Sequence, residues 1–258
     1  MTSLKQVIDA LEPIDAGWRG VIPDNWLQGR TAYGGVSTAL ALHAAQASEE
    51  DLPPLRSAQV AFIGPLAGTV LIRATRLRRG RNAAYVQADV ESEAGLGLRA
   101  TFVFMRELES RIDHVTGAAP AFDRPEPGTR VFTGVKGVAF TQNFEFLDRR
   151  DGQVGPSEWL RWVRLIDREG LDPTVELVAV ADCLPPSALK LLGGPAPVSS
   201  MTWLLNLLTP QPRTGDGWWL LRAVSDHVRA GASSQQMAIW DADGGAVAEQ
   251  MQSVAVFA

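Results

Sequence analysis

The sequence predicts an α+β protein built from two copies of one unit, in which a helix is followed by antiparallel strands. The first helix is expected at 34–47, where small apolar residues and strong helix formers run without interruption. Only strand-like runs rich in β-branched and aromatic residues follow it, up to about residue 106. A similar pattern recurs in the second half of the chain, and this repeat predicts the two-unit architecture.

The two halves match at four places that come in the same order. Gln59 corresponds to Leu204 and Ala94 to Gly244, so the offset drifts only from 145 to 150 along the chain. The runs 38–40, 59–65, 71–74 and 94–95 match 187–189, 204–210, 220–223 and 244–245, respectively. One such match is weak evidence, but four in order at a nearly constant offset indicate a duplication.

A linker separates the two units. Residues 107–130 are rich in Pro, Asp, Glu and Gly, which is the composition of a connecting segment. We therefore predict an N-terminal unit at 1–106, a linker at 107–130 and a C-terminal unit at 131–258.

The expected elements follow from residue type and from Gly and Pro punctuation. In the first unit, strands are expected at 56–63, 67–79, 83–93 and 97–106. In the second, short strands at 138–147 and 158–165 precede a helical stretch at 173–191, which Pro185-Pro186 interrupts. Strands at 200–208, 217–228, 233–242 and 246–257 complete the second unit.

Composition excludes several classes of protein. The chain has 258 residues, of which 46% are hydrophobic, enough for a full core. A formal net charge of -5 gives no reason to expect nucleic acid as a partner. The single cysteine excludes an internal disulfide framework, and no apolar run approaches the ~18 residues of a membrane span. With no signal peptide at Met1, we expect a soluble cytoplasmic protein.

The most informative segment is the turn that leads into the first helix. Gly34-Gly35 allows a backbone or a ligand to come close to the N-terminus of that helix. Free N–H groups at a helix N-terminus suit a polarised carbonyl or a phosphate. The alternative is that the glycine pair serves only the packing of helix against sheet.

At this point the sequence resembles a known family. The run 29–35, Gly-Arg-Thr-Ala-Tyr-Gly-Gly, is similar to the opening of acyl-CoA thioesterase II (TesB-like) proteins. The runs 158–164, 181–185 and 247–252 are similar to later motifs of that family, so the resemblance spans nearly the whole chain. It implies a double hotdog, in which each unit is a curved antiparallel sheet wrapped around a helix, and the two sheets are expected to join edge to edge. It also implies hydrolysis of a fatty-acyl-CoA, with coenzyme A as part of the substrate and no cofactor.

The resemblance also implies the catalytic residues, which hold the attacking water in that family. They fall on Asp182, Ser200 and Gln252 of this chain. Two departures are evident: Ser200 stands where the family usually has Thr, and Thr202-Trp203 stands where it often has an Asp-His pair. The internal repeat puts Tyr33, Leu55 and Phe102 at the matching places of the first unit, which predicts a polar pocket in the second unit only.

These residue types suit thioester hydrolysis. Asp182 can take a proton from water, and burial would make it a better base. Gln252 can orient water with its amide oxygen or donate from its NH2 to the developing oxyanion, and Ser200 can hold the water. No metal, Cys or His is required. Each residue also has an ordinary structural interpretation: Asp182 as a helix cap, Ser200 as part of a turn and Gln252 as a solvated strand residue.

Candidate substrate-binding residues are Tyr33, Gly34 and Gly35 at the turn, with Arg79 and Arg81 in a basic hairpin. The two arginines can meet the phosphates of coenzyme A, although a solvated charged turn is the simpler interpretation. Cys183 has no histidine near it in sequence, so a buried, inert thiol is expected. The three histidines show no metal-ligand spacing.

Three functions stay open on the sequence. The first is the acyl-CoA thioesterase. The second is a non-catalytic double hotdog that binds acyl-CoA, in which the altered Thr202-Trp203 neighbourhood has lost turnover. The third is a hotdog dehydratase or hydratase, which usually needs an Asp-His pair that this chain lacks after Asp182. Exposed sheet edges favour a homodimer in each case.

Overall fold

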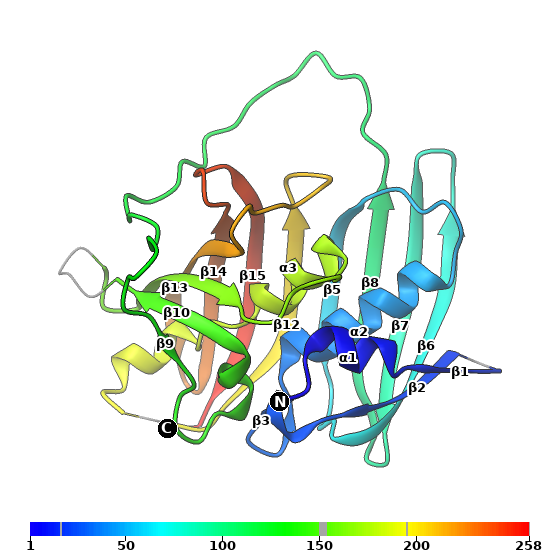
Figure 1. Ribbon diagram of the computed structural model, residues 1–258, viewed down its shortest axis with the longest axis horizontal. Helices are drawn as coiled ribbons and strands as arrows, with labels where there is room; N and C mark the ends of the chain where they lie inside the picture. Colours follow the sequence, from blue (N-terminus) through cyan, green and yellow to red (C-terminus); the bar gives the residue numbers. More distant parts are fainter. Residues whose placement is uncertain (16, 150–153, 195, 258) are drawn as a thin grey trace.

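The computed structural model describes residues 1–15, 17–149, 154–194 and 196–257. Its strands form one antiparallel sheet of 13 strands within this described part, plus a two-stranded ribbon of β3 and β4. The order in the large sheet is β1-β2-β6-β7-β8-β5-β12-β15-β14-β13-β11-β10-β9. The first unit therefore supplies one side of the sheet and the second unit the other (Figure 1).

The strands of the first unit are β1 (Glu12–Ile14), β2 (Gly17–Ile22), β3 (Leu27–Gln28), β4 (Thr31–Ala32), β5 (Leu55–Phe62), β6 (Gly68–Arg79), β7 (Ala83–Ser92) and β8 (Gly95–Met105). Those of the second unit are β9 (Phe132–Thr133), β10 (Phe144–Asp148), β11 (Glu158–Leu165), β12 (Val198–Leu207), β13 (Trp218–Arg229), β14 (Ala232–Trp240) and β15 (Ala246–Val256). The helices are α1 (Leu4–Asp9), α2 (Gly34–Ala47) and α3 (Pro173–Ala181), with 3-10 turns η1 (Asp24–Trp26), η2 (Ala139–Asn143) and η3 (Ser187–Leu191).

The two units join edge to edge through β5 and β12. These strands pair antiparallel from Thr202 opposite Ala61 to Asn206 opposite Ser57, so one continuous sheet crosses the boundary. The Ser57 hydroxyl also donates to Asn206 Oδ1 at 3.0 Å. The predicted double hotdog, with its edge-to-edge junction, is confirmed.

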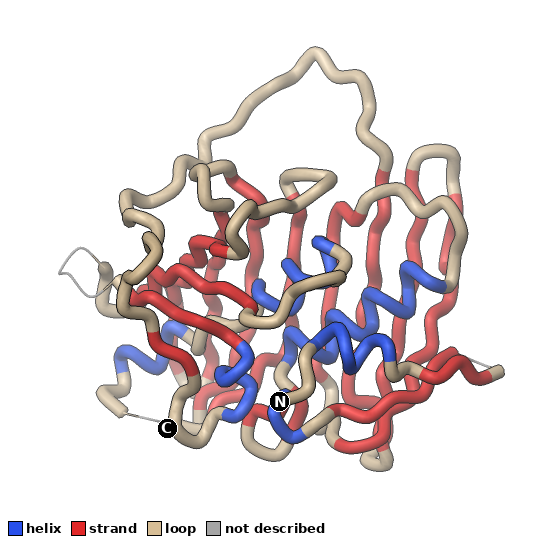
Figure 2. The backbone as a smooth tube through the Cα atoms, in the orientation of Figure 1, coloured by secondary structure: helices blue, strands red, loops and turns tan. Residues whose placement is uncertain are grey.

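Helices α2 and α3 lie together on one face of this sheet (Figures 1 and 2). Most residues of α2 and seven of the nine residues of α3 are buried, so neither helix has a polar face of ordinary width. Small residues such as Ala39, Ala41 and Ala44 in α2 allow the close contact that two helices under one curved sheet require. The core formed in this way contains residues of both units, including Leu40 and Leu177.

Matching β-bulges confirm the repeat. The register shifts at Leu55/Ser57 in the β5–β8 pair and at Ser200/Thr202 in the β12–β15 pair. Further shifts at Arg76/Arg78 and Val90/Glu91 have counterparts at Ser225/His227 and Ile239/Trp240. A bulge is a specific local bend, and three in equivalent places are strong evidence that the units share one plan.

Two of the three residue equivalences expected from the repeat agree with these registers. Leu55 and Ser200 are equivalent, because each is the last paired residue before the bulge of its strand, opposite Phe104 and Val254, respectively. Phe102 and Gln252 are equivalent, because each lies two residues before that partner on its own strand. The equivalence of Tyr33 with Asp182 is wrong, because Tyr33 precedes α2 whereas Asp182 follows α3. The match of 38–40 with 187–189 is wrong for the same reason: 187–189 lies in η3, beyond the central helix.

Other differences concern element boundaries and the N-terminal segment. The helical stretch expected at 173–191 ends at Ala181, because Pro185-Pro186 cannot continue an α-helix. The strand expected at 138–147 begins only at Phe144, after the 3-10 turn η2. The sequence interpretation assigned no structure before residue 34, yet α1, β1 and β2 form there, and β2 pairs with β6.

The segment predicted as a linker, 107–130, contains no helix or strand, and much of it runs as a long arch over one end of the sheet (Figure 1). Two tryptophans of the second unit hold it in place. The Trp162 indole N–H donates to the Phe122 carbonyl at 3.1 Å, and the Trp240 indole N–H donates to the Gly117 carbonyl at 2.9 Å. The connection therefore lies against the second unit.

Because one core serves both units, we expect the chain to unfold in a single transition. Leu40→Ala in α2 and Leu177→Ala in α3 should each lower the free energy of unfolding by about 2–5 kcal/mol, since both side chains are fully buried. Urea denaturation followed by fluorescence and circular dichroism measures this. Two separate transitions, each displaced by only one of the variants, would contradict a shared core.

Candidate active site

The candidate site lies where the C-terminal end of α3 meets the N-terminal end of α2. Asp182 directly follows α3 as its C-cap residue, and it is partly exposed. A Cβ atom placed on Gly34 would lie 2.5 Å from Asp182 Oδ2, and one on Gly35 would lie 2.6 Å from the Ala179 carbonyl oxygen. Only glycine allows this approach, so the Gly34-Gly35 pair is what brings the two helix ends together.

Tyr33 fastens the same junction. Its hydroxyl donates to the Ala179 carbonyl in the last turn of α3 at 2.8 Å, and its ring stacks on Phe140 with centroids 4.0 Å apart. Burial, with smaller contributions from Cys183 and Asp182, raises the Tyr33 pKa well above its usual value. Tyr33 is therefore neutral, and it links the start of α2 to the end of α3 through the hydrogen bond from its hydroxyl to Ala179.

Gln252 reaches Asp182 from β15. Its Nε2 donates to Asp182 Oδ1 at 2.5 Å, and its Oε1 accepts from Gln235 Nε2 on β14 at 2.9 Å. Both glutamines are buried, and they are directly paired across the two strands. Gln252 is thus a buried strand residue with specific partners, and the interpretation as a solvated strand position is wrong.

The surroundings of Asp182 raise its pKa from 3.8 to about 7. Desolvation by the surrounding protein is the largest cause, because it disfavours the charged carboxylate. Two donors act in the opposite direction: the Gln252 side chain and the backbone N–H of Gly35 at the start of α2. A carboxyl group with a pKa near neutrality can accept a proton in catalysis and is available in both forms.

Ser200 lies near this pair but does not bond to it. It faces Val254 across the β12–β15 pair, one inward-facing position along from the Trp203–Gln252 pair. It is partly exposed, and among the described residues its hydroxyl makes no hydrogen bond to Asp182 or Gln252. The structure therefore brings Asp182, Gln252, Tyr33, Gly34 and Gly35 together, with Ser200 on the same sheet face beside them.

Arg79 and Arg81 lie elsewhere. Arg79 donates to the backbone carbonyls of Glu50 and Asp51 at 3.3 and 2.8 Å, just beyond the C-terminal end of α2. Arg81 is exposed in the following hairpin. Because α2 has 14 residues, this position is about 20 Å along the helix from Gly35. A role for these arginines at coenzyme A phosphates stays a prediction, and their distance from Asp182 does not favour it.

Other reactive groups do not form a second catalytic centre. Cys183 is 2% exposed, and desolvation raises the pKa of its thiol, so the thiolate form is disfavoured. No group of three or more His, Cys, Asp or Glu side chains among the described residues is arranged to hold a metal ion. Within the described ranges, no helix is long and apolar enough to cross a membrane.

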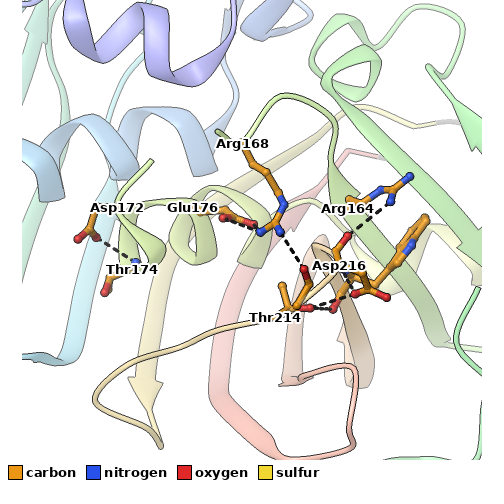
Figure 3. Close-up of polar contacts among 9 residues, drawn as sticks. Arg164, Arg168, Asp172, Thr174, Glu176, Thr214 and Asp216 are labelled. Carbon is orange, nitrogen blue, oxygen red and sulfur yellow. Dashed lines mark hydrogen bonds and ion pairs between the residues drawn. The ribbon is translucent and has the colours of Figure 1, made fainter. Parts of the chain in front are cut away.

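Two clefts of about 550 and 530 Å³ lie beside the other end of α3, and they share Pro173, Pro212 and Arg213. In this region Arg168 lies 3.5 Å from the buried carboxylate of Glu176, and Asp172 caps α3 by accepting from the Thr174 N–H (Figure 3). Desolvation raises the Glu176 pKa, and the nearby Arg168 opposes this shift. Neither cleft is lined by Asp182 or Gln252, so they are separate from the candidate site.

Comparison with known proteins agrees with this geometry. Residues 22–105 match the acyl-CoA thioesterase N-terminal domain family, and residues 108–256 match the acyl-CoA thioesterase C-terminal domain family. The chain belongs to the acyl-CoA thioesterase family. This membership identifies the protein as a thioester hydrolase. No curated protein matches the sequence.

Solved structures share the fold at low sequence identity. A hot dog fold protein of unknown function from Alicyclobacillus acidocaldarius is 21% identical, with a TM-score of 0.86 over 100% of this chain and 99% of its own. A putative thioesterase II from Thermobifida fusca is 21% identical, with a TM-score of 0.82 over 100% and 98%. The tesB protein of Mycobacterium avium subs paratuberculosis is 18% identical, with a TM-score of 0.80 over 99% and 100%.

Gln235 is a site residue that the sequence interpretation missed. It is equivalent to Val86 of the first unit. Val86 on β7 is paired with Phe102 on β8, and in the same way Gln235 on β14 is paired with Gln252 on β15. The offset from Val86 to Gln235 is 149, within the range already seen in the repeat. Comparing the two units at this offset would have revealed a second amide where the first unit has a valine.

Gly34→Ala tests whether close approach of the two helices builds the site. The new Cβ would meet Asp182 Oδ2 at 2.5 Å and the Phe62 ring at 2.9 Å, so the carboxylate must move. We expect a loss of about 1–3 kcal/mol in stability and at least tenfold in turnover. Gly80→Ala is the matched control, because its Cβ would meet only the Ala83 carbonyl oxygen at an ordinary 3.5 Å. Equal activity in the two variants would show that this approach is not needed.

Proposed function

We propose that this protein hydrolyses fatty-acyl-CoA to the free acid and coenzyme A, with Asp182 as the general base. The observation that carries the proposal is the contact of Asp182 with Gln252 at the N-terminus of α2, which holds a carboxyl group whose pKa is about 7. Membership of the acyl-CoA thioesterase family supports the class of reaction. The residue roles and the fatty-acyl substrate are the proposal itself.

In the proposed reaction, water attacks the thioester carbonyl while Asp182 accepts one of its protons. A tetrahedral oxyanion forms, and it collapses with cleavage of the C–S bond. The thiolate of coenzyme A leaves and takes up the proton from Asp182, so the carboxylate is regenerated. We assign stabilisation of the oxyanion to the second N–H of Gln252, because the first already holds Asp182, with the positive end of the α2 dipole beside it. We assign Ser200 to holding the water, because it lies on the same sheet face as Gln252 and its hydroxyl makes no hydrogen bond among the described residues.

A second candidate, a non-catalytic acyl-CoA binder, is supported by one observation. At Thr202-Trp203, where the resemblance led us to expect an Asp-His pair, the buried Trp203 indole N–H donates to Gln250 Oε1 at 2.8 Å, and the segment offers no ionisable side chain. The dehydratase alternative has less support. Dehydratase domains such as that of RzxB from Pseudomonas fluorescens share the fold with a TM-score of 0.59 at 14% identity, which shows fold alone. None of the described hydrogen bonds of Asp182 involves a histidine.

Asp182→Asn is the decisive variant for the proposed chemistry. It removes the base but keeps the shape, so turnover should fall by roughly 10²–10⁴-fold while acyl-CoA binding is largely kept. In the parent, the rate should rise with pH through about 7, because Asp182 must lose its proton before it can act as a base. Thioester release from acyl-CoA of several chain lengths, measured from pH 5 to 9, tests both points.

The outcomes of this assay separate the candidates. Hydrolysis by Asp182→Asn at the parent rate would remove Asp182 from the mechanism. Binding of acyl-CoA by the parent without any release of coenzyme A would favour the non-catalytic binder. Gln252→Ala should cost less than Asp182→Asn, because a water can partly replace its N–H donors. Ser200→Ala should cost least, because a hydroxyl that only positions water is partly replaceable.

We further propose that the protein works as a cytoplasmic homodimer. The outer face of the large sheet carries exposed apolar side chains such as Leu204 and Met251, which are directly paired across β12 and β15 and can be covered by a second copy of the chain. A single buried thiol, Cys183, suits a reducing compartment. Light scattering at micromolar concentration should give twice the chain mass of 27.8 kDa, and a monomer mass would contradict the dimer.

A further inference from the structure

A chain of buried hydrogen bonds continues behind Gln252. Gln235 Oε1 accepts from the backbone N–H of Ser187 at 3.0 Å and from the Ser187 hydroxyl at 3.3 Å. Ser187 Oγ in turn lies 2.8 Å from Ser225 Oγ, and Ser225 Oγ lies 3.1 Å from Ser233 Oγ. All of these side chains are buried, so their bonds are made without competition from bulk water.

The backbone N–H of Ser187 gives this chain of bonds a direction. A backbone N–H can only donate, so the oxygen of Gln235 must face Ser187 and its NH2 must face Gln252. The Gln252 oxygen is then engaged as an acceptor, and its NH2 must face Asp182. The second N–H of Gln235 points to the Met237 sulfur at 3.4 Å, so the amide of Gln235 has no capacity left for another role.

We propose that Gln235 is a positioning residue that fixes the amide orientation of Gln252, so that Gln252 serves the reaction centre as a hydrogen-bond donor. Of the two roles open to Gln252 on the sequence, this arrangement favours donation, because the Gln252 oxygen faces Gln235 whereas its NH2 faces the reaction centre. One N–H of Gln252 holds Asp182, and among the described residues the other makes no hydrogen bond, so it can donate to the substrate oxygen or the attacking water. This inference rests on the proposed function.

The first unit provides an internal comparison. At the places of Gln235 and Gln252 it has Val86 and Phe102, which are both fully buried and directly paired. The fold therefore accommodates an apolar pair at this point of the sheet. Two buried amides cost free energy unless both are satisfied. Their presence only in the unit that holds Asp182 points to a role at that carboxylate.

Gln235→Met tests the proposal, because methionine keeps the length and volume of glutamine but cannot donate. Without its partner, Gln252 can turn its oxygen toward Asp182 and lose the bond that favours the carboxylate. We expect kcat to fall roughly tenfold to a hundredfold with KM within about twofold. The acid limb of the pH–rate profile should move up by about one pH unit, since loss of a donor raises a carboxyl pKa.

Ser233→Ala is the matched control. It removes a buried hydrogen bond from the same strand and the same chain of bonds, but it does not touch either glutamine. It should leave kcat and the pH profile unchanged while lowering stability to a similar extent. If Gln235→Met kept the parent profile, or if both variants lost activity equally without a pH shift, Gln235 would be only structural and the proposal would be overturned.

A titration that needs no turnover separates this inference from the proposed function. Near Asp182, the titratable groups are Tyr33 and Cys183, with Arg161 acting on Cys183, and burial keeps both Tyr33 and Cys183 protonated at neutral pH. In the parent, the NMR signals of the Gln252 side-chain NH2 should therefore shift as Asp182 ionises. Gln235→Met should raise the midpoint of the Asp182 carboxyl signal by about one pH unit.

Unchanged NH2 signals across the titration of Asp182 in the parent would overturn the proposal, even if the methionine variant did not fold. If these shifts occur in a protein that hydrolyses no acyl-CoA, the proposed function fails and the positioning role stands.

Discussion

The structure depends on a close contact between the ends of two helices. Residues Gly34 and Gly35 at the start of α2 approach the last turn of α3 so closely that any side chain would collide with Asp182 or with the Ala179 carbonyl. This contact places a carboxylate beside the N-terminal end of one helix, where a backbone N–H is available. The contact contributes to the desolvation that raises the Asp182 pKa to about 7, and Gln252 reaches the same carboxylate from β15.

The duplication explains how such a site could be built without losing the fold. Both units keep the same β-bulges and the same strand order, so the scaffold is set twice by the same rules. Val86 and Phe102 in the first unit maintain an ordinary apolar core, while Gln235 and Gln252 at the equivalent places reach a carboxylate. The second unit thus gives up apolar burial at two positions, and the hydrogen bonds of the two amides offset part of that cost.

Much of the fold, but less of the site, could be predicted from the sequence. The bounds of α2 and β11 agreed with expectation, because the small-residue run of α2 begins at Gly34-Gly35 and the aromatic run of β11 lies between Gly155-Pro156 and Asp167. The segment before residue 34 was missed because its strands are short and not clearly alternating.

Asp182 and Gln252 were found only through resemblance to a family. Gln235 was not found, because it lies in Ser-Ser-Gln-Gln, where polar residues occupy both faces of the strand and the buried face cannot be recognised. Tyr33 was assigned to the wrong equivalence because the helix was expected to continue past Pro185-Pro186.

The proposed function depends on the junction of the two helices, where desolvation raises the pKa of Asp182 to a value suited to a base at neutral pH. The most direct measurement is the titration of the Asp182 carboxyl carbon by NMR in the parent protein, with Asp182→Asn used to assign the signal. The structure predicts a midpoint of about 7. A midpoint near 4, the value of a solvated aspartate, would contradict it.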